Sequence, residues 1–109
     1  MKVKIPFKPQ FENVMLGNVK TCTSRNRFYG VTGDTFDAFG STFWIFVVDK
    51  MILRDVSALL YKEEGCESPE EFEKVWAKIH PRKGFVWNQE VYVYHFKKLA
   101  PSTGEEKRR

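Results

Sequence analysis

The run Phe43-Trp44-Ile45-Phe46-Val47-Val48 is the longest apolar stretch of the chain and decides its fold class. Six apolar residues are far too few to span a membrane, and they suit a strand that is covered on both faces. We therefore expect a central, doubly covered strand here. It continues through residues 51–53 after a bulge near residues 49–50.

Alternating patterns predict three more strands around this one. Residues 2–8 alternate apolar side chains with lysines, which indicates a first strand with one solvent-facing side. Residues 35–39 can pair with residues 42–48 across a turn at Gly40-Ser41. Residues 89–99 alternate again, and we expect them to form the closing strand.

Helical signals lie between these strands. Residues 9–16 have apolar side chains at helical spacing and end at Gly17, which predicts a short helix. A second helix begins with Asp55 as its N-cap and ends near Gly65.

The third predicted helix has the clearest boundaries. Ser68 is its N-cap, Pro69 occupies its first position and Glu71 completes a capping box. Pro81 ends it. One apolar stripe at helical spacing faces the core. The stripe consists of Phe72, Val75, Trp76 and Ile79.

This order of elements predicts an α+β domain whose strands curl into a small, partly open β-barrel with helices packed on one side. A chain of 109 residues holds one domain, which we place at residues 1–100. Residues 101–109 form a charged tail that we expect to be disordered.

Composition narrows the possible functions. The net charge is +4, and Lys107, Arg108 and Arg109 supply much of it, so a phosphate-bearing partner is permitted without being required. Cys22 and Cys66 make neither a disulfide framework nor a zinc motif, and no glycine-rich phosphate loop is present. We expect a cytoplasmic protein with no membrane segment, no metal and no cofactor.

The segment Gly17-Asn18-Val19-Lys20-Thr21-Cys22-Thr23-Ser24-Arg25 concentrates polar groups. If it is extended, its side chains alternate between two faces. Lys20, Cys22 and Ser24 then share one face, and Thr21, Thr23 and Arg25 share the other. An ordinary polar strand and a functional segment are both compatible with this composition.

Lys20, Thr23 and Glu64 carry groups suited to nucleophilic catalysis. A threonine hydroxyl attacks a carbonyl only when a base takes its proton. A lysine serves as that base only where desolvation or a nearby cation such as Arg25 favours its neutral amine. A carboxylate can then serve the leaving group. For Glu63 and Glu64, a solvated helix end is the alternative interpretation.

In this order and spacing, the residues resemble the ASCH domain family of the PUA-like superfamily. Its signature is a helix ending in glycine, then a lysine, four residues and an arginine, matched by Gly17, Lys20 and Arg25. The Gly33-Asp34 turn, the step at residues 64–66 and the aromatic closing strand extend the resemblance over about residues 3–99. It implies a small β-barrel with flanking helices and a cleft that binds RNA or nucleotides.

The segment from Lys20 to Arg25 is similar to Lys-Thr-x-Thr-x-Arg of a small bacterial branch that removes the acetyl group from N4-acetylcytidine. This resemblance implies that Lys20 activates Thr23 as the nucleophile and that Glu64 is the acid/base. One extra residue between Gly17 and Lys20 departs from the branch, and either Glu63 or Glu64 can be the site carboxylate. The resemblance also implies substrate contacts, for which Thr21, Arg25 and Glu63 are the candidates.

Two functions remain open on the sequence. One is an amidohydrolase acting on N4-acetylcytidine or a related N-acyl nucleoside. The alternative is a non-catalytic RNA-binding module linked to translation or RNA metabolism, with a basic groove and exposed rings beyond the pocket. The candidate contacts in that groove are Lys62, Arg82, Lys83, Trp87 and Tyr29.

Overall fold

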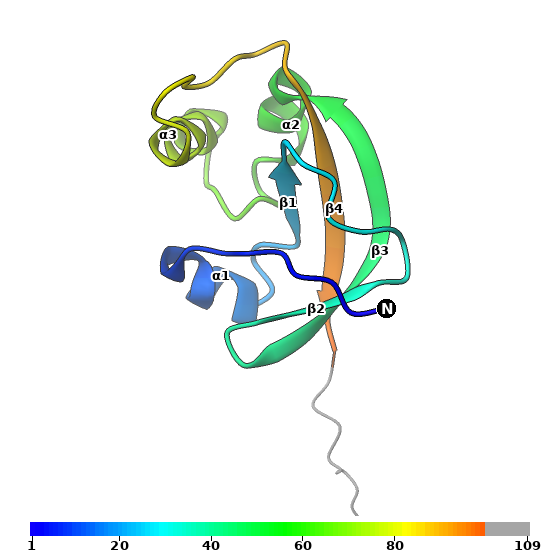
Figure 1. Cartoon of the computed structure of the whole chain (residues 1–109). Coiled ribbons are helices and arrows are strands. Elements are labelled where there is room, and N and C mark those ends of the chain that lie inside the picture. Colours follow the sequence, from blue (N-terminus) through cyan, green and yellow to red (C-terminus); the bar gives the residue numbers. More distant parts are fainter. Residues whose placement is uncertain (100–109) are drawn as a thin grey trace, which may run out of the picture.

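The computed structural model of the protein describes residues 1–99 (Figure 1). Short helices and strands lie in the first half, and a long strand, two helices and a closing strand follow. In chain order, the elements are η1 (Pro9–Phe11), α1 (Glu12–Leu16), β1 (Cys22–Arg25), β2 (Thr35–Ala38), β3 (Ser41–Ile52), α2 (Leu53–Leu60), α3 (Pro69–Ile79) and β4 (Glu90–Lys98). The tail predicted at residues 101–109 lies outside the described residues.

The four strands form one sheet in the order β1-β4-β3-β2, and every pair of neighbouring strands is antiparallel. The sheet is strongly curled, and α1 and α3 lie on the same side of β1 (Figure 1). The α+β class and the small, partly open barrel with flanking helices are therefore confirmed.

β4 is the strand that is covered on both faces. Val91 and Val93 belong to a buried cluster with residues of α2 and α3, whereas Tyr94 and Phe96 belong to a second cluster with residues of α1, β2 and β3. Neighbouring strand residues point to opposite faces, so the two clusters lie on the two sides of β4. The core of the domain is thus built around its closing strand.

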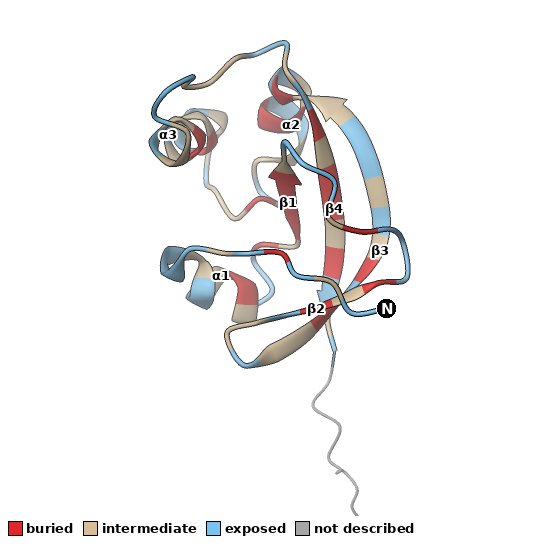
Figure 2. Ribbon diagram, in the orientation of Figure 1, coloured by how far each residue is buried: buried red, intermediate tan, exposed pale blue. Residues whose placement is uncertain are grey.

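The prediction that residues 43–48 form a doubly covered strand is wrong. Phe43 and Ile45 are fully buried, but Trp44 is 38% exposed and Val47 is 36% exposed. Much of β3 is coloured as exposed or intermediate in Figure 2. An apolar run does not reveal whether a helix covers its second face. The bulge also lies earlier than expected, between Ile45 and Val47.

Other element boundaries differ from the predictions because they depend on contacts with segments far away in the sequence. Residues 2–8 form one isolated parallel bridge, Lys2 with Thr35, in place of a strand, although Ile5 is buried as expected. The β2–β3 turn lies at residues 39–40. Helix α2 begins at Leu53, without a side-chain cap, so the predicted Asp55 N-cap is wrong.

The predicted boundaries of α3 are confirmed. The Ser68 hydroxyl accepts a hydrogen bond from the Glu71 amide at 3.0 Å, and Pro69 is the first helical residue. The Glu71 carboxylate reaches back to the Glu67 amide at 2.7 Å, one residue before the expected partner. These capping bonds define where α3 begins.

Candidate functional site

The backbone at the end of α1 positions Lys20. The amides of Val19 and Lys20 both donate to the Val14 carbonyl, at 2.9 and 2.8 Å. These bonds turn the chain from the helix into β1 and leave the Lys20 side chain only 3% exposed. A buried ammonium requires a partner, because desolvating an isolated charge is costly.

The turn after α2 brings Glu64 to Lys20. The amides of Thr21 and Cys22 both donate to the Glu63 carbonyl, at 2.7 and 3.0 Å, which fastens this turn to the start of β1. The Glu63 side chain points into solvent, whereas Glu64 is 5% exposed. Of the two carboxylates that the sequence left open, the buried one is therefore Glu64.

Gly65 permits this close approach in two ways. Its φ of +94° lies in the left-handed region that glycine adopts without strain. A Cβ at this position would also lie 3.0 Å from the Cβ of Lys20. A larger residue would therefore push Glu64 away from its partner.

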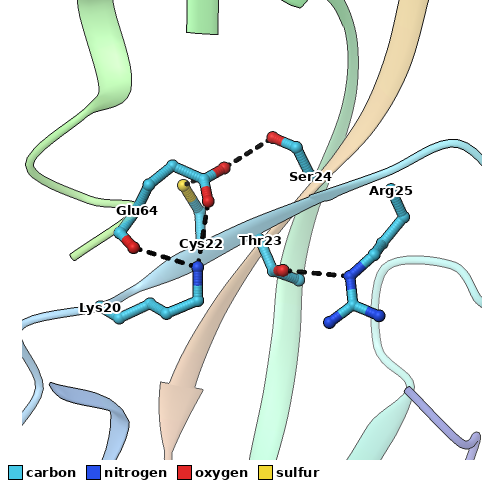
Figure 3. Close-up of polar contacts among 6 residues, drawn as sticks. All are labelled: Lys20, Cys22, Thr23, Ser24, Arg25 and Glu64. Atoms are coloured by element: carbon cyan, nitrogen blue, oxygen red, sulfur yellow. Dashed lines mark hydrogen bonds and ion pairs between the residues drawn. The ribbon is translucent and has the colours of Figure 1, made fainter. Parts of the chain in front are cut away.

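Residues 20–25, which include β1 and which we call the β1 segment, present three donors on one face. These donors converge on the Glu64 carboxylate (Figure 3). Lys20 Nζ lies 3.0 Å from Oε1 and also donates to the Glu64 carbonyl at 3.1 Å. Ser24 Oγ donates to Oε2 at 2.6 Å, and Cys22 Sγ lies 3.7 Å from the same oxygen. These are the three side chains that strand alternation places together.

Thr23 and Arg25 lie on the other face. Arg25 Nε donates to Thr23 Oγ1 at 3.2 Å (Figure 3). The Arg25 guanidinium carbon lies 4.6 Å from the ring centroid of Phe7 and 5.7 Å from that of Tyr29. Burial lowers the pKa of Arg25 from its ordinary value, although a guanidinium remains charged at neutral pH.

A cavity of about 210 Å³ lies where β1, α3 and the start of α1 meet. Its polar lining contains Lys20, Thr23, Ser24, Arg25 and Glu64. Aromatic rings supply much of the remaining wall. They belong to Phe11, Tyr29, Phe72, Trp76 and His80. A charged pair, two hydroxyls and several rings thus border one small space.

The aromatic wall is ordered by its own contacts. His80 stacks on Trp76 with ring centroids 4.1 Å apart, and His80 Nδ1 lies 3.0 Å from the Trp76 carbonyl oxygen. Lys20 Nζ lies 5.0 Å from the ring centroid of Phe11, which also lines the cavity. A flat ligand entering the cavity would therefore meet aromatic rings in its wall.

Both cysteines are free thiols. Burial raises the pKa of Cys66, which lines the cavity, to about 11. Burial, followed by the Glu64 carboxylate, raises the pKa of Cys22 far above its ordinary value. Neither thiol is therefore suited to act as a nucleophile near neutral pH.

Several predicted contact residues lie away from the cavity. The side chains of Glu63, Arg82, Lys83 and Trp87 are exposed, and none of them lines it. Arg82 and Lys83 border a separate surface depression of about 250 Å³. Thr21 contributes only backbone hydrogen bonds to this region, to Glu63 and Phe96. Roles for these residues in binding remain predictions.

Two cavity residues, Ser24 and Trp76, were not recognised as functional in the sequence. Ser24 donates the shortest hydrogen bond to Glu64, and its place on the Lys20 face was the available signal. Trp76 was interpreted only as a core residue. It is 5% exposed and belongs to the core, yet it also lines the cavity. Helical spacing alone does not distinguish these two environments.

Residues 1–99 contain no cluster of three or more His, Cys, Asp or Glu side chains arranged to ligate a metal ion. In the same part of the chain, no helix has the length and apolar character needed to cross a bilayer.

Comparison with solved structures identifies the fold. The structure superimposes on an ASCH domain from Lactobacillus crispatus with a TM-score of 0.68 and 12% identity, covering 89% of this chain and 79% of the other. The hypothetical protein PH0355 gives 0.69 and 14%, covering 91% and 100%. Protein EF3133 from Enterococcus faecalis gives 0.61 and 15%, covering 91% and 72%.

These identities establish the fold alone: the chain has the fold of an ASCH domain, as its sequence resemblance predicted. No family model matches the sequence, and no curated protein does.

Proposed function

We propose that the cavity binds a nucleoside base and hydrolyses the amide on an N-acylated exocyclic amine, with N4-acetylcytidine as the first substrate to test. The observation that carries this proposal is the buried Lys20–Glu64 ion pair, 3.0 Å long, in a cavity that the Thr23 hydroxyl also lines. A hydroxyl nucleophile and an acid–base pair are groups by which enzymes hydrolyse amides.

The size and walls of the cavity favour one flat heterocycle. Its volume of about 210 Å³ is below the ~300–1,000 Å³ of sites for drug-sized ligands. Rings of Phe11, Tyr29 and Trp76 can stack on a base. The polar groups of Lys20 and Glu64 can then meet its exocyclic edge.

A proton shift within the ion pair would prepare the reaction. In a water-poor cavity, transfer of a proton from Lys20 to Glu64 removes the cost of keeping two desolvated charges. Lys20 and Thr23 lie on different faces but line the same cavity, and in this scheme the neutral Lys20 amine takes the Thr23 proton across that cavity while Oγ1 attacks the acyl carbonyl. Glu64 gives its proton to the leaving nitrogen, which restores the charged pair.

Hydrolysis of the resulting ester on Thr23 repeats the same proton path. After the pair has become neutral again, Lys20 takes a proton from water as the water oxygen attacks the ester carbonyl. Glu64 returns a proton to Thr23 Oγ1 as the acid is released. The products are the free nucleoside and, from an acetyl substrate, acetate. Each half-reaction thus uses the same three residues.

Arg25 supports Thr23 in this scheme. Its Nε donates to Thr23 Oγ1 at 3.2 Å, so the hydroxyl oxygen accepts there and its own proton remains available to a base. The adjacent positive charge also favours a developing alkoxide.

Ser24 is the competing nucleophile. Its hydroxyl already donates to Glu64 Oε2 at 2.6 Å, so Glu64 could accept that proton directly. Separate substitutions of the two hydroxyls distinguish these schemes.

The test is conversion of N4-acetylcytidine to cytidine, followed by chromatography. We expect Thr23→Val and Lys20→Arg to reduce turnover by roughly 10³-fold or more, while Ser24→Ala retains measurable turnover. Normal turnover in Thr23→Val together with loss in Ser24→Ala would assign the nucleophile to Ser24. If the folded wild-type protein releases no cytidine, hydrolysis of this substrate is rejected.

The alternative function, a non-catalytic RNA-binding module, is supported by a different surface. Trp87 is 54% exposed, and the Arg54 guanidinium carbon lies 5.2 Å from its ring centroid. A ring beside cationic side chains is a stacking platform for single-stranded RNA. Its test is RNA affinity measured across a salt series. The combined Arg82→Ala and Lys83→Ala substitutions should then reduce the salt slope.

A further inference from the structure

The cavity has an excess of positive charge that its own residues do not neutralise. Lys20, Arg25 and Arg27 line it, and Glu64 is the only carboxylate in its described lining. Glu64 is already paired with Lys20 at 3.0 Å. The two arginines are thus left without a counter-charge inside the cavity.

Arg25 is the more constrained of the two. It is partly buried and held by its bond to Thr23 and by the rings of Phe7 and Tyr29. No carboxylate of residues 1–99 forms an ion pair with it. Burying a charge without a partner is unfavourable, and ring faces compensate only in part. A guanidinium that is held in place and lacks an ion-pair partner can bind an anion without reorganising.

We propose that the ligand of this cavity carries a phosphate group and that Arg25 binds it. The inference rests on the proposed nucleoside site: the base occupies the space between the rings, and the phosphate meets the β1 face opposite Glu64. Arginine suits this role because its planar fork donates two parallel hydrogen bonds to phosphate oxygens. Arg27, which is exposed and lines the same cavity, adds positive charge beside it.

The separation of charges within the cavity supports this arrangement. Strand alternation directs Lys20 and Ser24 toward Glu64 and directs Arg25 to the other face. A nucleotide would therefore place its neutral base edge at the Lys20–Glu64 pair and its anionic group at Arg25. A free nucleoside would leave the Arg25 charge uncompensated.

The experiment compares the binding of cytidine and cytidine 5′-monophosphate to the full chain by calorimetry at low salt. A charge-assisted contact predicts roughly 10- to 100-fold tighter binding of the monophosphate. Equal affinities in the wild-type protein would overturn the inference and leave the nucleoside site in place. If neither cytidine nor the monophosphate binds, both the phosphate inference and the proposed nucleoside site are rejected.

Two variants make the assignment specific. Arg25→Met keeps apolar contacts with Phe7 and Tyr29, and we expect it to remove the preference for the monophosphate. Lys97→Met is the matched control, because Lys97 is also a cation over a ring, that of Phe46, but does not line the cavity; it should leave the preference unchanged. A preference that persists in folded Arg25→Met would overturn the assignment. Melting temperatures establish that each variant is folded.

A last comparison separates the sources of the phosphate. Cytidine 3′-monophosphate, the 5′-monophosphate and a short oligocytidine present the group as a terminal monoester or as an internal diester. Tightest binding of the oligonucleotide, lost in Arg25→Met, would identify a base within RNA as the ligand. Tightest binding of one monophosphate would identify a free nucleotide. Either result supports a phosphate contact at Arg25.

Discussion

The two faces of the β1 segment are built from similar residues but differ in how completely their polar groups are satisfied. On one face, Lys20, Cys22 and Ser24 all direct their polar atoms to Glu64. On the other, Thr23 and Arg25 share one hydrogen bond and otherwise face rings and the cavity. We call the Glu64 face closed, because its polar groups bond to one another, and the Arg25 face open, because its polar groups keep hydrogen-bonding capacity toward the cavity.

This difference indicates that the two faces of the β1 segment contribute differently to stability and to ligand binding. Buried polar groups that satisfy one another stiffen a structure and are costly to interrupt. Groups with spare hydrogen-bonding capacity at a cavity wall contribute less to folding and remain available to a ligand. Substitutions on the closed face should therefore reduce stability more than those on the open face, and Lys20 and Glu64 also take part in the proposed reaction.

Glu64→Gln should have the largest effect on stability. It leaves the Lys20 ammonium, whose side chain is 4% exposed, without its counter-charge. Breaking a buried pair in this way costs about 3–5 kcal/mol of the free energy of unfolding, which urea denaturation measures. Glu63→Gln, next in the chain and exposed, is the control and should stay within about 0.5 kcal/mol of wild type. Equal effects would show that the pair is not a closed, buried unit.

Ser24→Ala should come next. It removes the 2.6 Å donor from Glu64 Oε2 and leaves the weak Cys22 thiol as the remaining partner of that oxygen. A hydrogen bond to a charged group contributes about 1.5–3 kcal/mol. The same denaturation experiment measures the loss. A change below about 0.5 kcal/mol would place Ser24 with the open face.

Thr23→Val should cost less stability than Ser24→Ala. The lost bond joins a hydroxyl to the partly exposed Arg25, where water can replace the missing acceptor, so we expect about 1 kcal/mol or less. Turnover of N4-acetylcytidine should nevertheless disappear. The comparison between the faces fails if Thr23→Val destabilises the fold as much as Ser24→Ala.

The smallest effect concerns the thiols. With its pKa raised to about 11 from an ordinary 9.0, Cys66 should react with a thiol reagent at pH 8 about 100-fold more slowly than a free cysteine. The rate should rise about tenfold per pH unit towards pH 11, because the reactive thiolate increases with pH. Cys22, buried on the closed face, should react only after unfolding. Cys66→Ser is the control, and the folded variant should show no thiol that reacts before unfolding.

Local patterns in the sequence predicted much of the fold. The start of α3 is correct because Ser68, Pro69 and Glu71 act within one helical turn. The grouping of Lys20, Cys22 and Ser24 is correct because alternation follows from strand geometry. Errors arose where a distant partner decides: residues 2–8 find only one bridge, and β3 has an exposed outer face.

The candidate site was only partly accessible from the sequence. Lys20 and Glu64 were connected through the family resemblance, since nothing local links residues 44 positions apart. Ser24 was on the correct face but had no visible partner. Trp76 followed the pattern of a core residue and belongs to the core, while its contact with the cavity depends on where α3 lies relative to β1.

The sequence by itself determined the fold class, the boundaries of α3 and which side chains of β1 share a face, because each depends on residues close together in the chain. Only the tertiary structure decided that Glu64 and not Glu63 meets Lys20, and that β4 and not β3 is covered on both faces. Both outcomes depend on long-range contacts. Backbone hydrogen bonds from Thr21 and Cys22 to Glu63 turn Glu64 inward, and the helices cover only part of the curled sheet.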